Sequence, residues 1–131
     1  MGNIVPTWLM AGDAHEEVAH RIAHQGLHPV LDIGSGQGRL SDVLPARWPY
    51  VGIESSPTQL RRNTGGTVVR GGASHLPFAD RTLGAVAALW MLYHLDDPVG
   101  AVAEARRVLR PDGVFFACTT SRNNGPELIE R

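Results

Sequence analysis

The chain of 131 residues has 12 basic and 13 acidic residues, a formal net charge of −1, and 43% hydrophobic and 19% charged residues. These values are typical of one globular domain, here residues 1–131, and they give no support to nucleic acid or an anionic membrane as a partner. All basic residues are arginine, which excludes lysine Schiff-base chemistry and a lysine-bearing phosphate loop. The pairs Arg61–Arg62 and Arg106–Arg107 are isolated and typical of solvated helix faces.

Cysteine, histidine and apolar residues are distributed as in a cytoplasmic protein without a metal site. Cys118 is the single cysteine, so no internal disulfide forms, and we expect it to be a small buried residue. His20 and His24 have a spacing that can bind a metal, but no acid completes the set, which favours a solvated helix face. The N-terminus lacks the features of a signal peptide, and no apolar run approaches the ~20 residues that span a bilayer. The composition, rich in arginine, alanine and glycine, is associated with bacterial genomes.

The predicted elements alternate between helices and strands along the chain. Asp13 and Glu16 form a capping box that predicts a helix through about Gln25, where Gly26 ends it. The elements that follow are a strand at 30–33, a helix at 39–44, a strand at 50–53, a short helix from 57, strands at 67–70 and 83–89, a helix from 98 and a strand at 114–119. Apolar strands that alternate with helices predict a parallel sheet covered on both faces.

The caps and turns between these elements are also visible. Ser56 before Pro57 is a typical helix cap, and either Asp96 or Asp97 caps the helix that begins at residue 98. Residues 111–113, Pro-Asp-Gly, predict a turn. Residues 127–131 predict at most one helical turn.

A glycine loop follows the strand at 30–33. Its sequence, Gly-Ser-Gly-Gln-Gly at 34–38, differs from a dinucleotide-binding loop, whose third glycine would stand where Arg39 is. Asp32 precedes the first glycine by two residues, where a carboxylate opposes a pyrophosphate but pairs with a cationic amino group. The combination favours an amino-acid-bearing nucleoside over a dinucleotide. The other interpretation of Asp32 is a capping or loop-tethering residue.

Glu54 ends the next strand. A carboxylate there can accept hydrogen bonds from both ribose hydroxyls, each contributing about 1.5–3 kcal/mol because one partner is charged. The other interpretation is a solvated acid at a strand end.

Several further motifs carry a family resemblance. These motifs are residues 30–38, Glu54, residues 76–80 (Leu-Pro-Phe-Ala-Asp), residues 94–98 (His-Leu-Asp-Asp-Pro) and residues 107–113 (Arg-Val-Leu-Arg-Pro-Asp-Gly). Over residues 14–120 the chain resembles the class I S-adenosylmethionine-dependent methyltransferases, and most of all the branch of the ubiquinone/menaquinone-biosynthesis methyltransferases. The resemblance implies an α/β fold, a Rossmann-like three-layer sandwich whose mainly parallel sheet has about five strands in the order 3-2-1-4-5. It also implies S-adenosylmethionine as cofactor, S-adenosylhomocysteine as product and a small-molecule methyl acceptor.

The resemblance also implies roles for individual residues. The methionine moiety would be approached by the loop residues Gly34, Ser35, Gly36 and Gly38, with Asp32 near its amino group and Leu89 and Trp90 along its side. The ribose would be held by Glu54. The adenine would lie beside Ser55, Gly72, Ala73 and Ser74. His94 and Tyr93 are the candidates for a general base or an acceptor contact. The alternatives are a packing or capping role for His94 and a half-buried wall position for Tyr93.

The chain departs from the family pattern at three places. Many relatives carry an acid at the position of Gly72, where it accepts a hydrogen bond from the adenine amino group, and an acid is also frequent at the position of Gly84. Relatives continue past the fifth strand with a helix and two more strands, so we expect a truncated sheet. Its exposed fifth-strand edge would then favour a homodimer, a swapped segment or a truncated gene product.

Three functions remain open from the sequence. The first is a methyltransferase acting on a small molecule. The second is a degenerate module that binds S-adenosylmethionine or a partner without catalysis. The third is another nucleotide binder of similar architecture.

Overall fold

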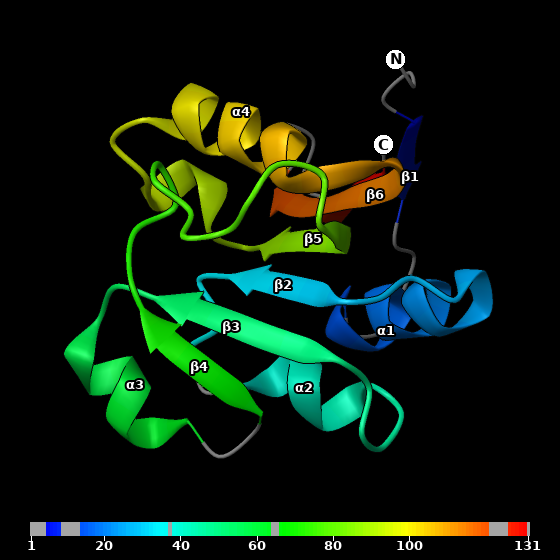
Figure 1. Cartoon of the computed structure of the whole chain (residues 1–131), viewed down its shortest axis with the longest axis horizontal. Coiled ribbons are helices and arrows are strands. Elements are labelled where there is room, and N and C mark those ends of the chain that lie inside the picture. Colours follow the sequence, from blue (N-terminus) through cyan, green and yellow to red (C-terminus); the bar gives the residue numbers. More distant parts are fainter. Residues whose placement is uncertain (1–4, 9–13, 37, 64–65, 121–125, 131) are drawn as a thin grey trace.

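The computed structural model describes residues 5–8, 14–36, 38–63, 66–120 and 126–130. Within these ranges the strands form a sheet of seven in the order β1-β7-β6-β5-β2-β3-β4 (Figure 1). Their bounds are β1 Val5–Trp8, β2 Val30–Ile33, β3 Tyr50–Glu54, β4 Thr67–Arg70, β5 Leu83–Leu89, β6 Leu109–Thr120 and β7 Pro126–Glu130.

Five strands, β4-β3-β2-β5-β6, pair in parallel, and in chain order their arrangement is 3-2-1-4-5. The predicted fold class and strand order are therefore confirmed. All residues of β2 and β5 are buried, as expected for central strands of a parallel sheet covered on both faces.

Helices cover both faces of the sheet and give it three layers. They are α1 Ala14–Gln25, α2 Arg39–Val43, α3 Pro57–Arg62 and α4 Pro98–Val108, with a short 3₁₀ turn, η1, at Leu92–His94. Because successive strand residues point to opposite faces, Val30 packs with α1 and α2 whereas Leu31 packs with α4. No helix in the described part of the chain is long and apolar enough to span a bilayer.

The local signals at the helix ends are those expected from the sequence. The Ser56 hydroxyl accepts a hydrogen bond from the Gln59 N–H at 3.3 Å, with Pro57 in the first helical position of α3. Asp97, and not Asp96, caps α4, because its carboxylate accepts the Gly100 N–H at 2.9 Å. The predicted cap Asp13 lies outside the described residues.

The far edge of the sheet differs from the prediction. Residues 126–130 form β7, which pairs antiparallel with β6, and β1 pairs antiparallel with β7 in turn. The expected helical turn at the end of the chain and the exposed fifth-strand edge are both wrong. β7 satisfies the backbone groups of β6 that would otherwise be free, so the premise for a homodimer through that edge does not hold in this structure.

The predicted turn at 111–113 is an irregular stretch inside β6. Leu83 pairs with Leu109 but Ala85 pairs with Val114, so the register shifts across this segment. Gly84 lies opposite the irregularity, and a Cβ there would come within 2.6 Å of the His28 backbone. The structure leaves no room at Gly84 for the acid that many relatives carry.

Candidate functional site

The glycine loop leaves the carboxyl end of β2 and is tied to the neighbouring strand. Gly34 and Gly36 have φ values of 66° and 58°, a left-handed conformation that favours glycine. The N–H groups of Gly34 and Ser35 both donate to the Ile53 carbonyl, at 2.8 and 3.2 Å. The loop therefore lies directly beside the end of β3, where Glu54 follows.

Glu54 holds the loop and the start of α3 with one carboxylate. Its Oε1 accepts the Gly36 N–H at 2.8 Å, and its Oε2 accepts the Ser56 N–H at 3.0 Å. Each carboxylate oxygen can accept two hydrogen bonds, so one acceptor position on each oxygen remains for a ligand. The side chain is oriented by the backbone before any ligand arrives.

Asp32 lies beneath the loop and is only 3% exposed. Its Oδ2 accepts a hydrogen bond from the Tyr50 hydroxyl at 2.8 Å. Burial raises the pKa of Asp32 to about 7, with the nearby Glu54 charge adding to the effect and the Tyr50 bond opposing it. Burial, together with Asp32, raises the pKa of Tyr50 above its ordinary value. The Ser35 hydroxyl is buried and interacts with the Tyr50 hydroxyl.

Two cavities meet at the glycine loop and Glu54. The first has a volume of about 270 Å³ and is lined by Ile33, Gly34, Ile53, Glu54, Ser55, Gly71, Gly72, Ala73, Met91, His94 and Leu95. The second has a volume of about 560 Å³ and is lined by His15, Gly34, Ser35, Gly36, Arg39, Asp42, Glu54 and Gln59. Gly34 and Glu54 contribute to both, so the cavities adjoin at these residues.

The structure brings together only part of the predicted site. The predicted residues that line these cavities are Gly34, Ser35, Gly36, Glu54, Ser55, Gly72, Ala73 and His94. The predicted residues that line neither of the two are Asp32, Gly38, Ser74, Leu89, Trp90 and Tyr93. Leu89 is a core residue, and Trp90 packs against the same core cluster.

His94 and Tyr93 differ in position although they are neighbours. Both belong to η1, and their ring centroids are 4.2 Å apart. His94 lines the first cavity, whereas Tyr93 is 59% exposed and does not have the half-buried position considered for it. Cys118 is fully buried, and burial raises the pKa of its thiol to about 11, so the group stays protonated at neutral pH.

Sequence analysis missed nine of the residues that line the cavities, among them Met91, Leu95 and His15. Met91 packs over the glycine loop, with side-chain atoms 3.1 Å from where a Cβ at Gly34 would lie. Leu95 follows one residue after His94 and could have been included with it. His15 belongs to the first turn of α1, and no local pattern indicates that this turn faces the loop; burial lowers its pKa.

The similarity of this chain to known proteins extends over the residues that form the candidate site. A family model described as a methyltransferase domain matches residues 31–117, which include the glycine loop, Glu54 and the Ala73 segment. The chain belongs to this methyltransferase family. The family assignment supports S-adenosylmethionine as the cofactor and agrees with the Rossmann-like sheet order.

Relatives of this methyltransferase domain are longer than the chain itself. A protein of Mycolicibacterium smegmatis named "Probable S-adenosylmethionine-dependent methyltransferase" is 33% identical over 115 residues, covering 82% of this chain and 44% of the relative. The demethylmenaquinone methyltransferase of Thermobifida fusca is 35% identical over 104 residues, covering 70% of this chain and 43% of the relative. The chain thus spans less than half the length of these relatives.

Among solved structures, the [4+2]-cyclase SpnF has the same fold. Its TM-score is 0.68 with 22% identity, covering 79% of this chain and 44% of that chain. This likeness concerns the fold alone, because one scaffold can carry different chemistries.

Proposed function

We propose that the methyltransferase domain binds S-adenosylmethionine across the two adjoining cavities and transfers its methyl group to a small-molecule acceptor. The observation that carries this proposal is the Glu54 carboxylate at their junction. It is fixed by the Gly36 and Ser56 N–H groups and keeps one acceptor position on each oxygen. Two vicinal ribose hydroxyls match that pair of acceptors.

The surroundings of Glu54 suit the rest of the cofactor. Apolar groups of Ile53, Ala73 and Leu95 line the first cavity, which fits an adenine ring. A Cβ at Gly36 or Gly72 would meet nothing within 4 Å, so both backbones are open to a close approach. The buried Ser35 hydroxyl lines the second cavity and is a further polar group that a ligand could contact.

The remaining expected residues act less directly in this proposal. Asp32 lies under the loop and accepts a hydrogen bond from Tyr50, which in turn interacts with Ser35 of the loop, and this favours the loop-tethering interpretation. Gly38, Ser74 and Trp90 stay in the proposed cofactor set as chain neighbours of lining residues, Leu89 as the neighbour of Trp90, and Tyr93 as the neighbour of His94.

When bound, S-adenosylmethionine supplies an activated methyl group on a sulfonium sulfur. The task left to the protein is to orient the acceptor and to exclude water. His94 lies at the exposed rim of the first cavity, from which it can contact an acceptor or take its proton. The fixed backbone of the glycine loop and Glu54 holds the ribose while this occurs.

A cofactor-binding module without methyl transfer is the second candidate. The exposure of both His94 and Tyr93 favours it, because an exposed base is poorly shielded from water. Methyl transfer from labelled S-adenosylmethionine to any acceptor in a panel of phenols, quinols, amines and carboxylic acids separates the two candidates.

Cofactor binding is tested by titration calorimetry and thermal unfolding with S-adenosylmethionine and S-adenosylhomocysteine, with NAD as control. At about 100 times the dissociation constant, a ligand stabilises the fold by about 2.7 kcal/mol and raises Tm by several degrees. Glu54→Ala removes two charge-assisted hydrogen bonds to the ligand, so we expect affinity to fall about a hundredfold or more.

Glu17→Ala is the matched control, because Glu17 is a half-exposed glutamate on α1 paired only with Arg21 in the described structure. It should bind like the wild type. A well-folded wild type that gains no stability from either sulfur ligand would refute the proposed function.

A further inference from the structure

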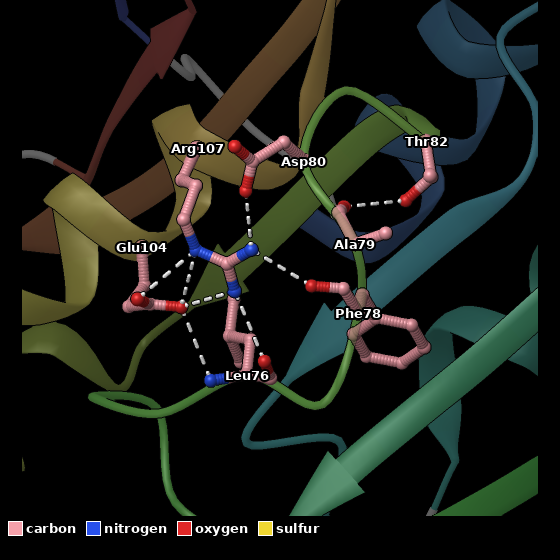
Figure 2. Close-up of polar contacts among 7 residues, drawn as sticks. All are labelled: Leu76, Phe78, Ala79, Asp80, Thr82, Glu104 and Arg107. Atoms are coloured by element: carbon pink, nitrogen blue, oxygen red, sulfur yellow. Dashed lines mark hydrogen bonds and ion pairs between the residues drawn. The ribbon is translucent and has the colours of Figure 1, made fainter.

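The Arg107 side chain bonds to Glu104 and to three residues of the loop that precedes β5. It was expected on a solvated helix face, and that expectation is wrong. Its Nη1 donates to the Phe78 carbonyl and to Asp80 Oδ1, both at 2.8 Å, and its Nη2 donates to the Leu76 carbonyl at 3.0 Å (Figure 2). The same guanidinium contacts the Glu104 carboxylate one helical turn earlier, at 2.6 Å.

Glu104 extends this cluster to the other side of Leu76. Its Oε2 accepts the Leu76 N–H at 3.2 Å while Arg107 donates to the Leu76 carbonyl (Figure 2). The hydrogen bonds from Arg107 lower the pKa of Glu104, so the carboxylate is charged at neutral pH. The two side chains together hold both backbone groups of one loop residue.

The ion pairs alone do not explain this arrangement. The Asp80 side chain is 65% exposed, and an ion pair so exposed contributes little to stability. The bonds to the Leu76 and Phe78 carbonyls are different, because they require a planar group with several donors. Arg107 therefore restrains the path of the loop backbone.

That loop forms one wall of the first cavity. Gly71, Gly72 and Ala73 line the cavity, and Leu76 follows three residues after Ala73. Ala73 and Leu76 are both buried in the apolar cluster that includes Ala101 and Ala105 of α4. The beginning of the loop is fixed where the Gly71 N–H donates to the Glu54 carbonyl at 3.1 Å. Its other end is fixed at α4.

A second segment of the cavity lining is also attached to α4. His94 and Leu95 line the cavity and precede Asp97, the cap of α4. The start of α4 thus adjoins one lining segment, and Arg107, near the end of α4, holds the loop that continues the other.

We propose that Arg107 is a positioning residue that sets the adenine wall of the cavity by holding the loop at Leu76 and Phe78. The inference rests on the proposed binding of S-adenosylmethionine. Without Arg107, the Gly71–Leu76 backbone is less ordered in the free protein, so the binding of S-adenosylmethionine must order it. Ordering even one residue corresponds to about a tenfold loss of affinity.

The test compares Arg107→Met and Arg107→Lys with the matched control Arg106→Met, a neighbouring exposed arginine. Affinities for S-adenosylhomocysteine and S-inosylhomocysteine are measured well below Tm. The second ligand has hypoxanthine in place of adenine and presents the opposite donor and acceptor at the ring edge. We expect Arg107→Met to bind S-adenosylhomocysteine about tenfold more weakly and to lose most of the preference for adenine. General destabilisation would not change that preference.

Arg107→Lys keeps the positive charge but not the fork of donors, so it should resemble Arg107→Met. Hydrogen exchange provides a readout that needs no ligand. The 71–76 amides should exchange at least about tenfold faster in Arg107→Met, with those of α1 unchanged. Wild-type exchange and wild-type adenine preference in that variant would overturn the inference. If the wild type binds neither ligand, the proposed function fails, and hydrogen exchange alone then decides whether Arg107 holds the loop.

Discussion

At the residue scale, Gly72 shows that a departure from the family pattern can leave space for the missing group. A Cβ at Gly72 would meet no atom within 4 Å, and the residue lines the first cavity beside Ala73. An acid there could accept a hydrogen bond from the adenine amino group, as the resemblance implies for many relatives. The position is therefore open to substitution without repacking.

We predict that Gly72→Asp binds S-adenosylhomocysteine a few-fold to tenfold more tightly, since one added hydrogen bond contributes about 0.5–1.5 kcal/mol. Titration calorimetry measures the change. Gly72→Ala adds a methyl group without an acceptor and should match the wild type. Weaker binding by Gly72→Asp would mean that repulsion from Glu54 exceeds the gain.

Asp32 makes stability depend on pH. Its pKa is raised to about 7 by burial, against an ordinary value of about 3.9 in an unfolded chain. Between these values the folded protein keeps a proton that the unfolded chain has released, so the free energy of unfolding falls as pH rises. The stabilisation is complete below pH ~4 and is lost through pH ~7, roughly 4 kcal/mol at most.

Asp32→Asn removes this titration while keeping an acceptor for the Tyr50 hydroxyl. Urea unfolding between pH 4.5 and 8 should therefore give a flatter stability profile for Asp32→Asn than for the wild type. Asp112→Asn is the control, because the Asp112 side chain is 86% exposed, and its profile should run parallel to that of the wild type. Parallel profiles for Asp32→Asn and the wild type would show that the Asp32 pKa is not raised.

The candidate site residues that sequence could place together are those whose positions depend on chain neighbours. Glu54 at a strand end and the glycines after Ile33 belong to this group. The Asp32–Tyr50 bond crosses from one strand to the next, and Arg107 contacts a loop 27–31 residues earlier in the chain. An Arg-Arg pair looks alike in sequence whether it is solvated or bonded, so Arg107 could not be assigned.

At the element scale, the strands and helices follow signals within a few residues. β4 and β5 have the predicted bounds, and the Ser56 cap is present in the structure. The sequence left Asp96 and Asp97 equally suited to cap α4, because either could start the helix. Only the backbone direction at Pro98 decides between them.

We predict that Asp97→Ala lowers the free energy of unfolding by about 1 kcal/mol, since the Gly100 N–H loses its acceptor. For a chain of this size the corresponding fall in Tm is about 3–6 °C. Asp96→Ala changes a neighbouring exposed carboxylate and should leave Tm unaltered. Equal effects of the two substitutions in calorimetry would contradict the assignment of the cap. Because α4 adjoins both cavity walls, Asp97→Ala should also weaken ligand binding slightly.

At the scale of the whole molecule, the central sheet was predictable and its edge was not. The parallel strands are short apolar segments with helices between them, and right-handed connections leave few arrangements for such a series. β7 is a five-residue strand whose two neighbours are β6 and β1, and β1 lies at the opposite end of the sequence. Such a strand is specified by its partners, so residues 126–130 alone resemble a helical turn as much as a strand.

The pairing of β7 with both neighbours can be tested with a proline. Leu128 pairs with Cys118 of β6 and with Thr7 of β1, and proline cannot donate a backbone hydrogen bond. We predict that Leu128→Pro lowers the free energy of unfolding by at least about 1 kcal/mol and frees the outer edge of β6.

An exposed edge promotes strand addition, so the variant should also associate with itself more strongly than the wild type as concentration rises. Light scattering after size exclusion measures this, and Leu128→Val, which keeps the N–H and favours strand conformation, serves as control. If Leu128→Pro matched Leu128→Val in stability and association, β7 would not protect the edge of β6. The expectation from the sequence that this edge is exposed would then be correct.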